Sequence, residues 1–123
     1  MYKNFILESK NFLTTKECRY LIKEYKKISK PSKEKGHGYN YVDLEGKPAF
    51  NKLAVLMLPV LTEYKKKYPE VDLTKNKWAL TNMRFKHFKP GKLFEKFHSE
   101  HSYEHATRLL NIQIYLSDHN CGT

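Results

Sequence analysis

The 123-residue chain has little cysteine, little arginine and no long apolar run, and each shortage excludes a class of protein. No apolar stretch approaches the length of about 18 residues that a membrane-spanning helix needs. Residues 1–30 also lack the apolar centre of a secretory signal peptide. The two cysteines, Cys18 and Cys121, show neither CxxC nor zinc-ligand spacing, so we expect free thiols in a reducing compartment. These features predict a cytoplasmic protein with no membrane partner.

The positive charge is large, but its distribution argues against a nucleic-acid reader. The formal net charge is +10, and of the 23 basic residues only Arg19, Arg84 and Arg108 are arginine. The lysines are spread along the chain, whereas nucleic-acid-binding proteins more often cluster basic residues among aromatic ones. We therefore interpret most lysines as solvated surface and do not expect nucleic acid as a partner. A Lys-rich module that binds another polyanion stays open as an alternative function.

The first third of the chain predicts a strand, a helix and a loop. Residues 2–8 favour a short strand. Thr14 and Glu17 form the capping-box pattern of a helix start, and the helix should run to about Ser29. Its core-facing stripe consists of Cys18, Leu21, Ile22, Tyr25 and Ile28. Residues 30–40 are rich in Lys, Gly, Pro and Ser and predict a loop.

A second helix should begin at Pro48, which suits a first helical position, and end near Tyr68. Pro59 lies inside this pattern and should kink or split the helix. The expected inner face consists of Phe50, Leu53, Ala54, Met57, Leu61 and Tyr64. Two helices are thus expected before the strand-rich end of the chain.

Residues 78–88, 93–100 and 107–116 have the composition of strands. In the last of these, alternation places Leu110, Ile112, Ile114 and Leu116 on one face and Leu109, Asn111, Gln113 and Tyr115 on the other. Helices followed by strands predict the α+β class.

His98 and Glu100 are two residues apart, and this spacing is the strongest sign of chemistry in the chain. On a strand their side chains would point to the same face and could bind one metal ion. An imidazole and a carboxylate are two of the three ligands in the 2-His-1-carboxylate triad that holds non-haem Fe(II). Taken alone, the pair is better interpreted as two polar residues on a surface strand.

Several segments accompany this pair in order: Lys89-Pro90-Gly91, Phe97-His98-Ser99-Glu100, Arg108-Leu109-Leu110, Tyr115-Leu116-Ser117-Asp118 and Cys121-Gly122-Thr123. In this order and spacing they resemble the 2-oxoglutarate- and Fe(II)-dependent dioxygenases, specifically the prolyl-4-hydroxylase-like branch common in phages and marine bacteria. His87-Phe88 stands where that branch has Arg-Tyr, which removes a tyrosine hydroxyl that often touches the cosubstrate. Ser117-Asp118 stands in place of Asn-Asp.

The resemblance implies a fold and a chemistry. N-terminal helices would pack on an incomplete double-stranded β-helix, a jelly-roll variant, within a single domain over residues 1–123. Residues 1–75 would be its strand and helical support, and residues 76–123 its first jelly-roll strands. His98 and Glu100 would bind Fe(II), while Phe88, Arg108 and Tyr115 would contact 2-oxoglutarate. A structural ion pair is an equal alternative for Arg108. Tyr115 and Asn111 share a face and could line the pocket, with core packing or solvent exposure as equal alternatives. The family hydroxylates C–H bonds with O2, releases succinate and CO2, and uses ascorbate as reductant.

The chain ends at Thr123, before any counterpart of the family's second histidine or of the basic residue that pairs with the far carboxylate of 2-oxoglutarate. We therefore expect the N-terminal part of such a hydroxylase, inactive alone, with weak or no metal binding and no catalytic residue to assign. A protein or peptide substrate would suit the full-length form. The alternative is a non-enzymatic half-domain that binds a partner or forms a homodimer or higher oligomer through exposed strands.

Overall fold

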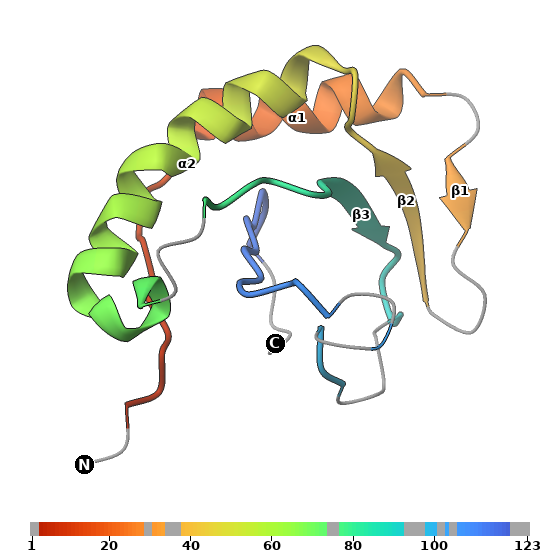
Figure 1. The fold of residues 1–123 in the computed structure, drawn as a ribbon. Coiled ribbons are helices and arrows are strands. Elements are labelled where there is room, and N and C mark those ends of the chain that lie inside the picture. Colours follow the sequence, from red (N-terminus) through yellow and green to blue (C-terminus); the bar gives the residue numbers. More distant parts are fainter. Residues whose placement is uncertain are drawn as a thin grey trace. The chain divides into compact units, whose positions relative to one another are not determined.

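A computed structural model describes residues 3–28, 31–33, 38–73, 77–92, 98–100, 103 and 106–118. The elements in chain order are α1 (Thr15–Lys26), β1 (Ser32–Lys33), β2 (Tyr39–Asp43), α2 (Pro48–Lys67), the 3-10 helix η1 (Pro69–Asp72) and β3 (Arg84–Phe88) (Figure 1). The sheet order is β1-β2-β3, and β1 pairs antiparallel with β2, with Ser32 opposite Tyr41. The α+β class is confirmed. The chain divides into two compact units: Met1–Thr14 with Val42–Phe85, and Thr15–Tyr41 with Lys86–Thr123.

The first unit is built around α2, which confirms the predicted second helix. Pro48 occupies its first turn, where the missing N–H of proline costs nothing. The helix is continuous through Pro59 and curves along its length (Figure 1), so proline bends it without splitting it. The buried side chains of α2 are Ala49, Leu53, Met57 and Tyr64. They agree with the predicted inner face, on which Phe50, Ala54 and Leu61 are half-buried.

The N-terminal segment of this unit is not a strand over residues 3–8, so that prediction was wrong. Phe5 and Asn11 have φ angles of 53° and 56°, in the left-handed region that strands do not use. Backbone carbonyls of this segment accept hydrogen bonds from side chains at the C-terminal end of α2 instead. The Tyr64 hydroxyl donates to the Phe5 carbonyl at 2.7 Å, and the Tyr68 hydroxyl donates to the Ile6 carbonyl at 2.7 Å. Tyrosine hydroxyls, and not a strand ladder, hold this segment.

The second unit contains α1, so the predicted first helix is confirmed. The helix ends at Lys26 and not near Ser29. Leu21 and Tyr25 are its buried residues, and the Tyr25 ring meets the His87 ring edge-on at 5.4 Å. The predicted loop over residues 30–40 was partly wrong, because β1 and the start of β2 lie within it. β1 is only two polar residues long, which is too short to carry a periodic apolar pattern, so composition missed it.

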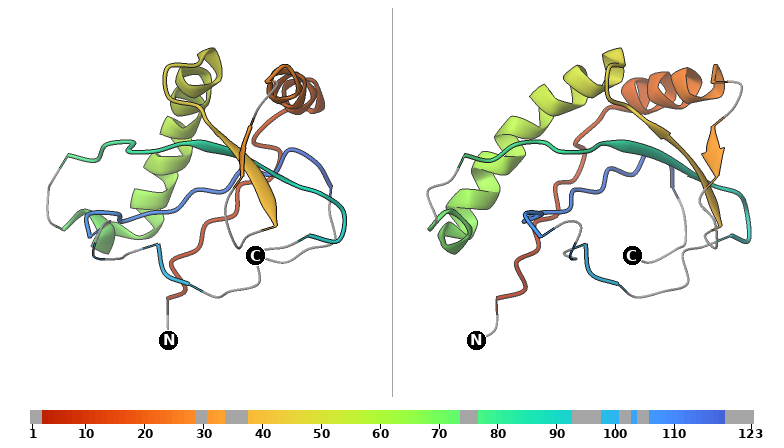
Figure 2. Two further views of the ribbon diagram at one scale, coloured as in Figure 1. Left: turned by 90° about the vertical axis from the view of Figure 1, so that its right-hand side faces the viewer. Right: turned by 45° about the vertical axis from the view of Figure 1, so that its right-hand side comes forward.

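The C-terminal strands are shorter than predicted. Of residues 78–88 only Arg84–Phe88 forms a strand, and residues 98–100 and 107–116 carry no strand assignment. Residues 93–97 lie outside the described part of the chain. Residues 108–116 still follow an extended path (Figure 2), with Leu110, Ile114 and Leu116 partly buried and Leu109 and Tyr115 exposed. The predicted alternation of faces is present except at Ile112, which is exposed although its predicted face is the inner one, and strand pairing is not seen among the described residues.

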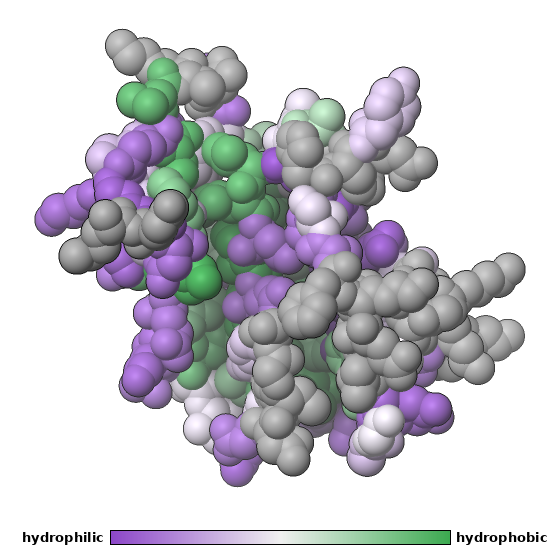
Figure 3. Space-filling view, turned by 90° about the horizontal axis from the view of Figure 1, so that it is seen from below, coloured by the Kyte–Doolittle hydropathy of each residue, from purple (hydrophilic) through white to green (hydrophobic). Residues whose placement is uncertain are grey.

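Apolar side chains also reach the surface, where green side chains are open to view between purple ones in Figure 3. The exposed large ones include Ile6, Val55, Leu58, Leu73, Leu109 and Tyr115. Within the described residues, no helix combines the length and the apolar character needed to cross a bilayer.

Candidate metal site

The structure brings the two predicted metal ligands together. His98 Nε2 lies 3.2 Å from Glu100 Oε1, and His98 is exposed whereas Glu100 is half-buried. The segment that carries them, residues 98–100, is not a strand. The two side chains nevertheless meet, although Glu100 lies at a bend of the backbone and the predicted strand is not what brings them together.

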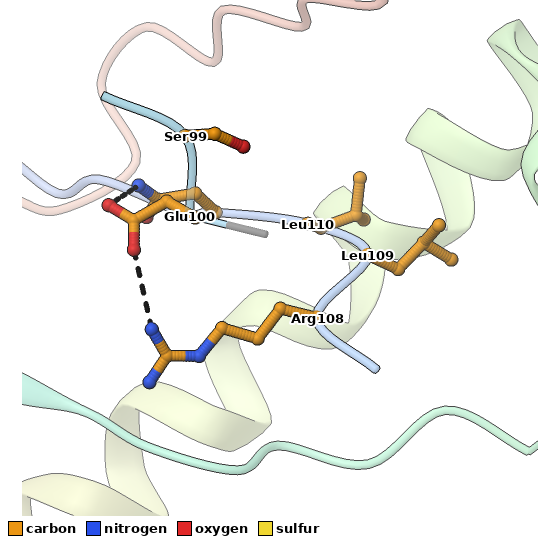
Figure 4. A pocket seen from close by; sticks show the side chains of 6 residues that line it. Ser99, Glu100, Arg108, Leu109 and Leu110 are labelled. Carbon is orange, nitrogen blue, oxygen red and sulfur yellow. Dashed lines mark hydrogen bonds and ion pairs between the residues drawn. The ribbon is translucent and has the colours of Figure 1, made fainter. Parts of the chain in front are cut away.

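Glu100 is the centre of a small polar cluster. Its Oε2 accepts a charge-assisted hydrogen bond from Arg108 Nη1 at 3.4 Å, and its Oε1 accepts one from Asn111 Nδ2 at 3.0 Å (Figure 4). Both donors come from the extended segment 106–118, so the cluster ties that segment to residues 98–100. The carboxylate is thus held at both oxygens by donors of different charge.

A hollow of about 220 Å³ opens beside the cluster. Its lining consists of Ser99, Glu100, Arg108, Leu109, Leu110 and Asn111. Figure 4 shows the Glu100 and Arg108 side chains pointing toward each other, with Leu109 and Leu110 continuing along the same segment. The site therefore combines one carboxylate, one guanidinium and one amide with an apolar wall.

The other predicted contacts lie elsewhere. Phe88 is at the end of β3, exposed, with its ring 4.9 Å from the Tyr39 ring. The Tyr115 hydroxyl donates to Gln113 Oε1 at 2.8 Å. Neither side chain lines the hollow at Glu100, whereas Arg108 does. Asn111, which shares a predicted face with Tyr115 and could line a pocket from there, contacts Glu100 directly. No local pattern distinguishes it from Gln113 on the same face.

The donor set can be tested against a metal ion. Ligand bonds of about 2.0–2.2 Å that meet at about 90° leave roughly 3 Å between two donor atoms. The 3.2 Å between His98 Nε2 and Glu100 Oε1 is the length of a hydrogen bond between the two side chains, and it is also close to the spacing of two adjacent ligands of one ion. Within the described ranges no group of three His, Cys, Asp or Glu side chains is placed to hold a metal. The pair alone does not make up a metal site.

A second polar hollow, of about 160 Å³, provides a contrast in the first unit. It is lined by Asp43, Glu45, Thr81, Asn82, Met83 and Arg84. Arg84 Nε donates to Asp43 Oδ1 at 2.7 Å, which repeats the pairing of carboxylate and guanidinium seen at Glu100. None of these six residues is a histidine. The Glu100 cluster differs from this second hollow by the imidazole beside its carboxylate.

Comparison of the chain with protein-family models, curated proteins and solved structures finds no match. The site has to be argued from its own residues and their geometry.

Proposed function

We propose that this protein is a 2-oxoglutarate- and Fe(II)-dependent dioxygenase of the prolyl-4-hydroxylase-like kind, and that His98 and Glu100 are two of its metal ligands. The observation that carries the proposal is the 3.2 Å approach of His98 Nε2 to Glu100 Oε1. The order of motifs from Lys89 to Asp118 supports it. In this proposal the extended C-terminal segments are the first strands of an incomplete double-stranded β-helix.

In this proposal the residues of the site have different roles. His98 supplies a neutral imidazole and Glu100 a hard oxygen, a mixture suited to divalent iron, manganese or cobalt. Fe(II) with 2-oxoglutarate and O2 supplies oxidation of an unactivated C–H bond when bound. Arg108 supports the assignment to cosubstrate binding because it lines the hollow beside Glu100. Phe88 and Tyr115 gain no such support, and a cosubstrate contact through either would require a further part of the site.

Two ligands leave a metal loosely held, because a facial triad needs a third ligand from outside the described residues. We expect Mn(II) or Co(II) to bind the chain with an affinity weaker than micromolar. With Fe(II), ascorbate and 2-oxoglutarate, succinate should not rise above the level of a His98→Ala control. Succinate well above that level would show that the chain completes its own site.

The first experiment compares Mn(II) binding, by electron paramagnetic resonance, in the wild type with binding in His98→Ala and Glu100→Ala. Both variants should lose the bound signal. Asp43→Ala is the matched control, because it removes a carboxylate that pairs with an arginine at the other hollow and has no imidazole beside it. Binding that survives Glu100→Ala, or that is lost equally in Asp43→Ala, would contradict the proposal.

A second candidate function, a strand-pairing module without enzymatic activity, is favoured by a separate observation. Leu109, Ile112 and Tyr115 are exposed, and residues 108–116 are extended without strand pairing among the described residues. Extended segments with free edges are templates for pairing with another chain. This candidate predicts a homodimer or higher oligomer in size exclusion with light scattering, and Ile112→Lys should shift it toward monomer. A monomer at high micromolar concentration would exclude it.

The Lys-rich polyanion module draws less support from the structure. Several lysines already have intramolecular partners: Lys3 pairs with Glu70, Lys65 with Asp72, and the Lys86 ammonium lies 4.9 Å from the centre of the Tyr39 ring. Their charge is therefore partly used inside the fold.

A further inference from the structure

We infer that Asn111 is a positioning residue for Glu100, and that its amide turns Oε1 of the carboxylate toward His98 so that a divalent cation can bind between them. The inference rests on the proposed function, because it assumes that His98 and Glu100 are metal ligands. It adds a contact to Glu100 that sequence analysis did not assign.

The geometry distinguishes the two oxygens of Glu100. Asn111 Nδ2 donates to Oε1 at 3.0 Å, and Oε1 is also the oxygen that lies 3.2 Å from His98 Nε2. Arg108 Nη1 approaches the other oxygen, Oε2, at 3.4 Å. A carboxylate held at both oxygens cannot rotate freely about its last bond. Its plane is thus set by residues 108 and 111 and not by the metal.

The charge of each donor decides its effect on a metal. The Arg108 guanidinium partly neutralises the carboxylate and so competes with a cation for it. The Asn111 amide is neutral, and a carboxylate oxygen has two lone pairs, so Oε1 can accept the amide hydrogen and still bind a metal. Asn111 therefore orients the ligand oxygen with little loss of its negative charge. Partners that hold a ligating carboxylate in this way typically change metal affinity strongly when they are removed.

The test replaces Asn111 by leucine, which has a similar shape and no donor, and uses Gln113→Leu as the matched control. Gln113 is an exposed amide two residues further along, and its Oε1 accepts from Tyr115 and not from the cluster. Asn111→Leu should weaken Mn(II) binding about 10-fold, while Gln113→Leu should leave it unchanged. Because both positions are exposed, the circular dichroism and the unfolding midpoint should match the wild type in each variant.

A second readout separates positioning from a merely structural role. Zn(II), which is diamagnetic, should displace the side-chain amide resonances of Asn111 in a ¹H–¹⁵N NMR spectrum and leave those of Gln113 in place. Glu100→Ala should remove that displacement. If the wild type binds metal through His98 and Glu100 while Asn111→Leu binds equally well, or the Asn111 amide does not respond, the inference is overturned and the proposed function stands. If His98→Ala and Glu100→Ala bind as the wild type does, the proposed function and the inference both fail.

Discussion

Two regions of the molecule use tyrosine hydroxyls in opposite ways. At the end of α2, Tyr64 and Tyr68 are 9% and 5% exposed, and their hydroxyls donate to carbonyls of the N-terminal segment about 60 residues away in sequence. In residues 106–118, Tyr115 is 50% exposed and its hydroxyl donates to Gln113, two residues away in sequence. The first region joins distant segments through buried contacts, and such regions open last. The second presents its polar side chains to the site and has little buried apolar area to hold it.

The largest test of this difference is a pair of leucines. Replacing Leu53, which is 5% exposed on α2, by alanine should lower the protein's free energy of unfolding by about 3 kcal/mol, because a cavity replaces packed atoms. Replacing Leu109, which is 58% exposed beside the site, by alanine should lower the free energy of unfolding by less than about 0.5 kcal/mol. Urea unfolding measures both. Equal losses would mean that residues 106–118 contribute as much to the folded state as α2 does.

A pair of tyrosines gives a smaller effect. Tyr68→Phe removes the hydroxyl that donates to the Ile6 carbonyl at 2.7 Å and contacts Asn4 Oδ1 at 3.0 Å, and it should cost about 1–2 kcal/mol. Tyr115→Phe removes an exposed, local hydrogen bond and should cost less than about 0.5 kcal/mol. Limited proteolysis should also cut the N-terminal segment of Tyr68→Phe faster than that of the wild type. An unchanged cleavage rate would show that other contacts hold this segment.

The smallest expected effect is on the stability of the protein at alkaline pH. Burial, with a further contribution from the Tyr68 phenol, raises the pKa of the Tyr64 phenol above its usual value. The protonated form is therefore favoured in the folded state. Its contribution to stability is complete below the unfolded pKa of about 10 and is lost as the pH rises through the folded pKa. The stability difference between wild type and Tyr64→Phe should thus shrink above about pH 10. Urea unfolding across that range measures it, and a difference that grows would contradict the assignment.

Several features of the fold could be predicted because they depend on local patterns. The two helices follow from apolar spacing and from Pro48 at a first turn, and both are confirmed. The strand predicted for residues 2–8 is wrong in its described part, because carbonyls that a ladder would have used accept hydrogen bonds from Tyr64 and Tyr68 instead. Residues 107–116 show the predicted alternation, except at the exposed Ile112, without the strand. Alternation reflects the backbone's extended form, whereas a strand also requires a neighbour.

The candidate site also has one part that the sequence predicts and another part that only the tertiary structure shows. The sequence by itself determined that His98 and Glu100 lie two residues apart, which is close enough for their side chains to meet. Only the tertiary structure decided that Arg108 and Asn111 hold the carboxylate, while Phe88 and Tyr115 lie outside the hollow. The physical reason is that a contact between two residues so close in sequence depends only on the local backbone. Which donor reaches an acceptor eight or eleven residues away depends on how the intervening chain turns.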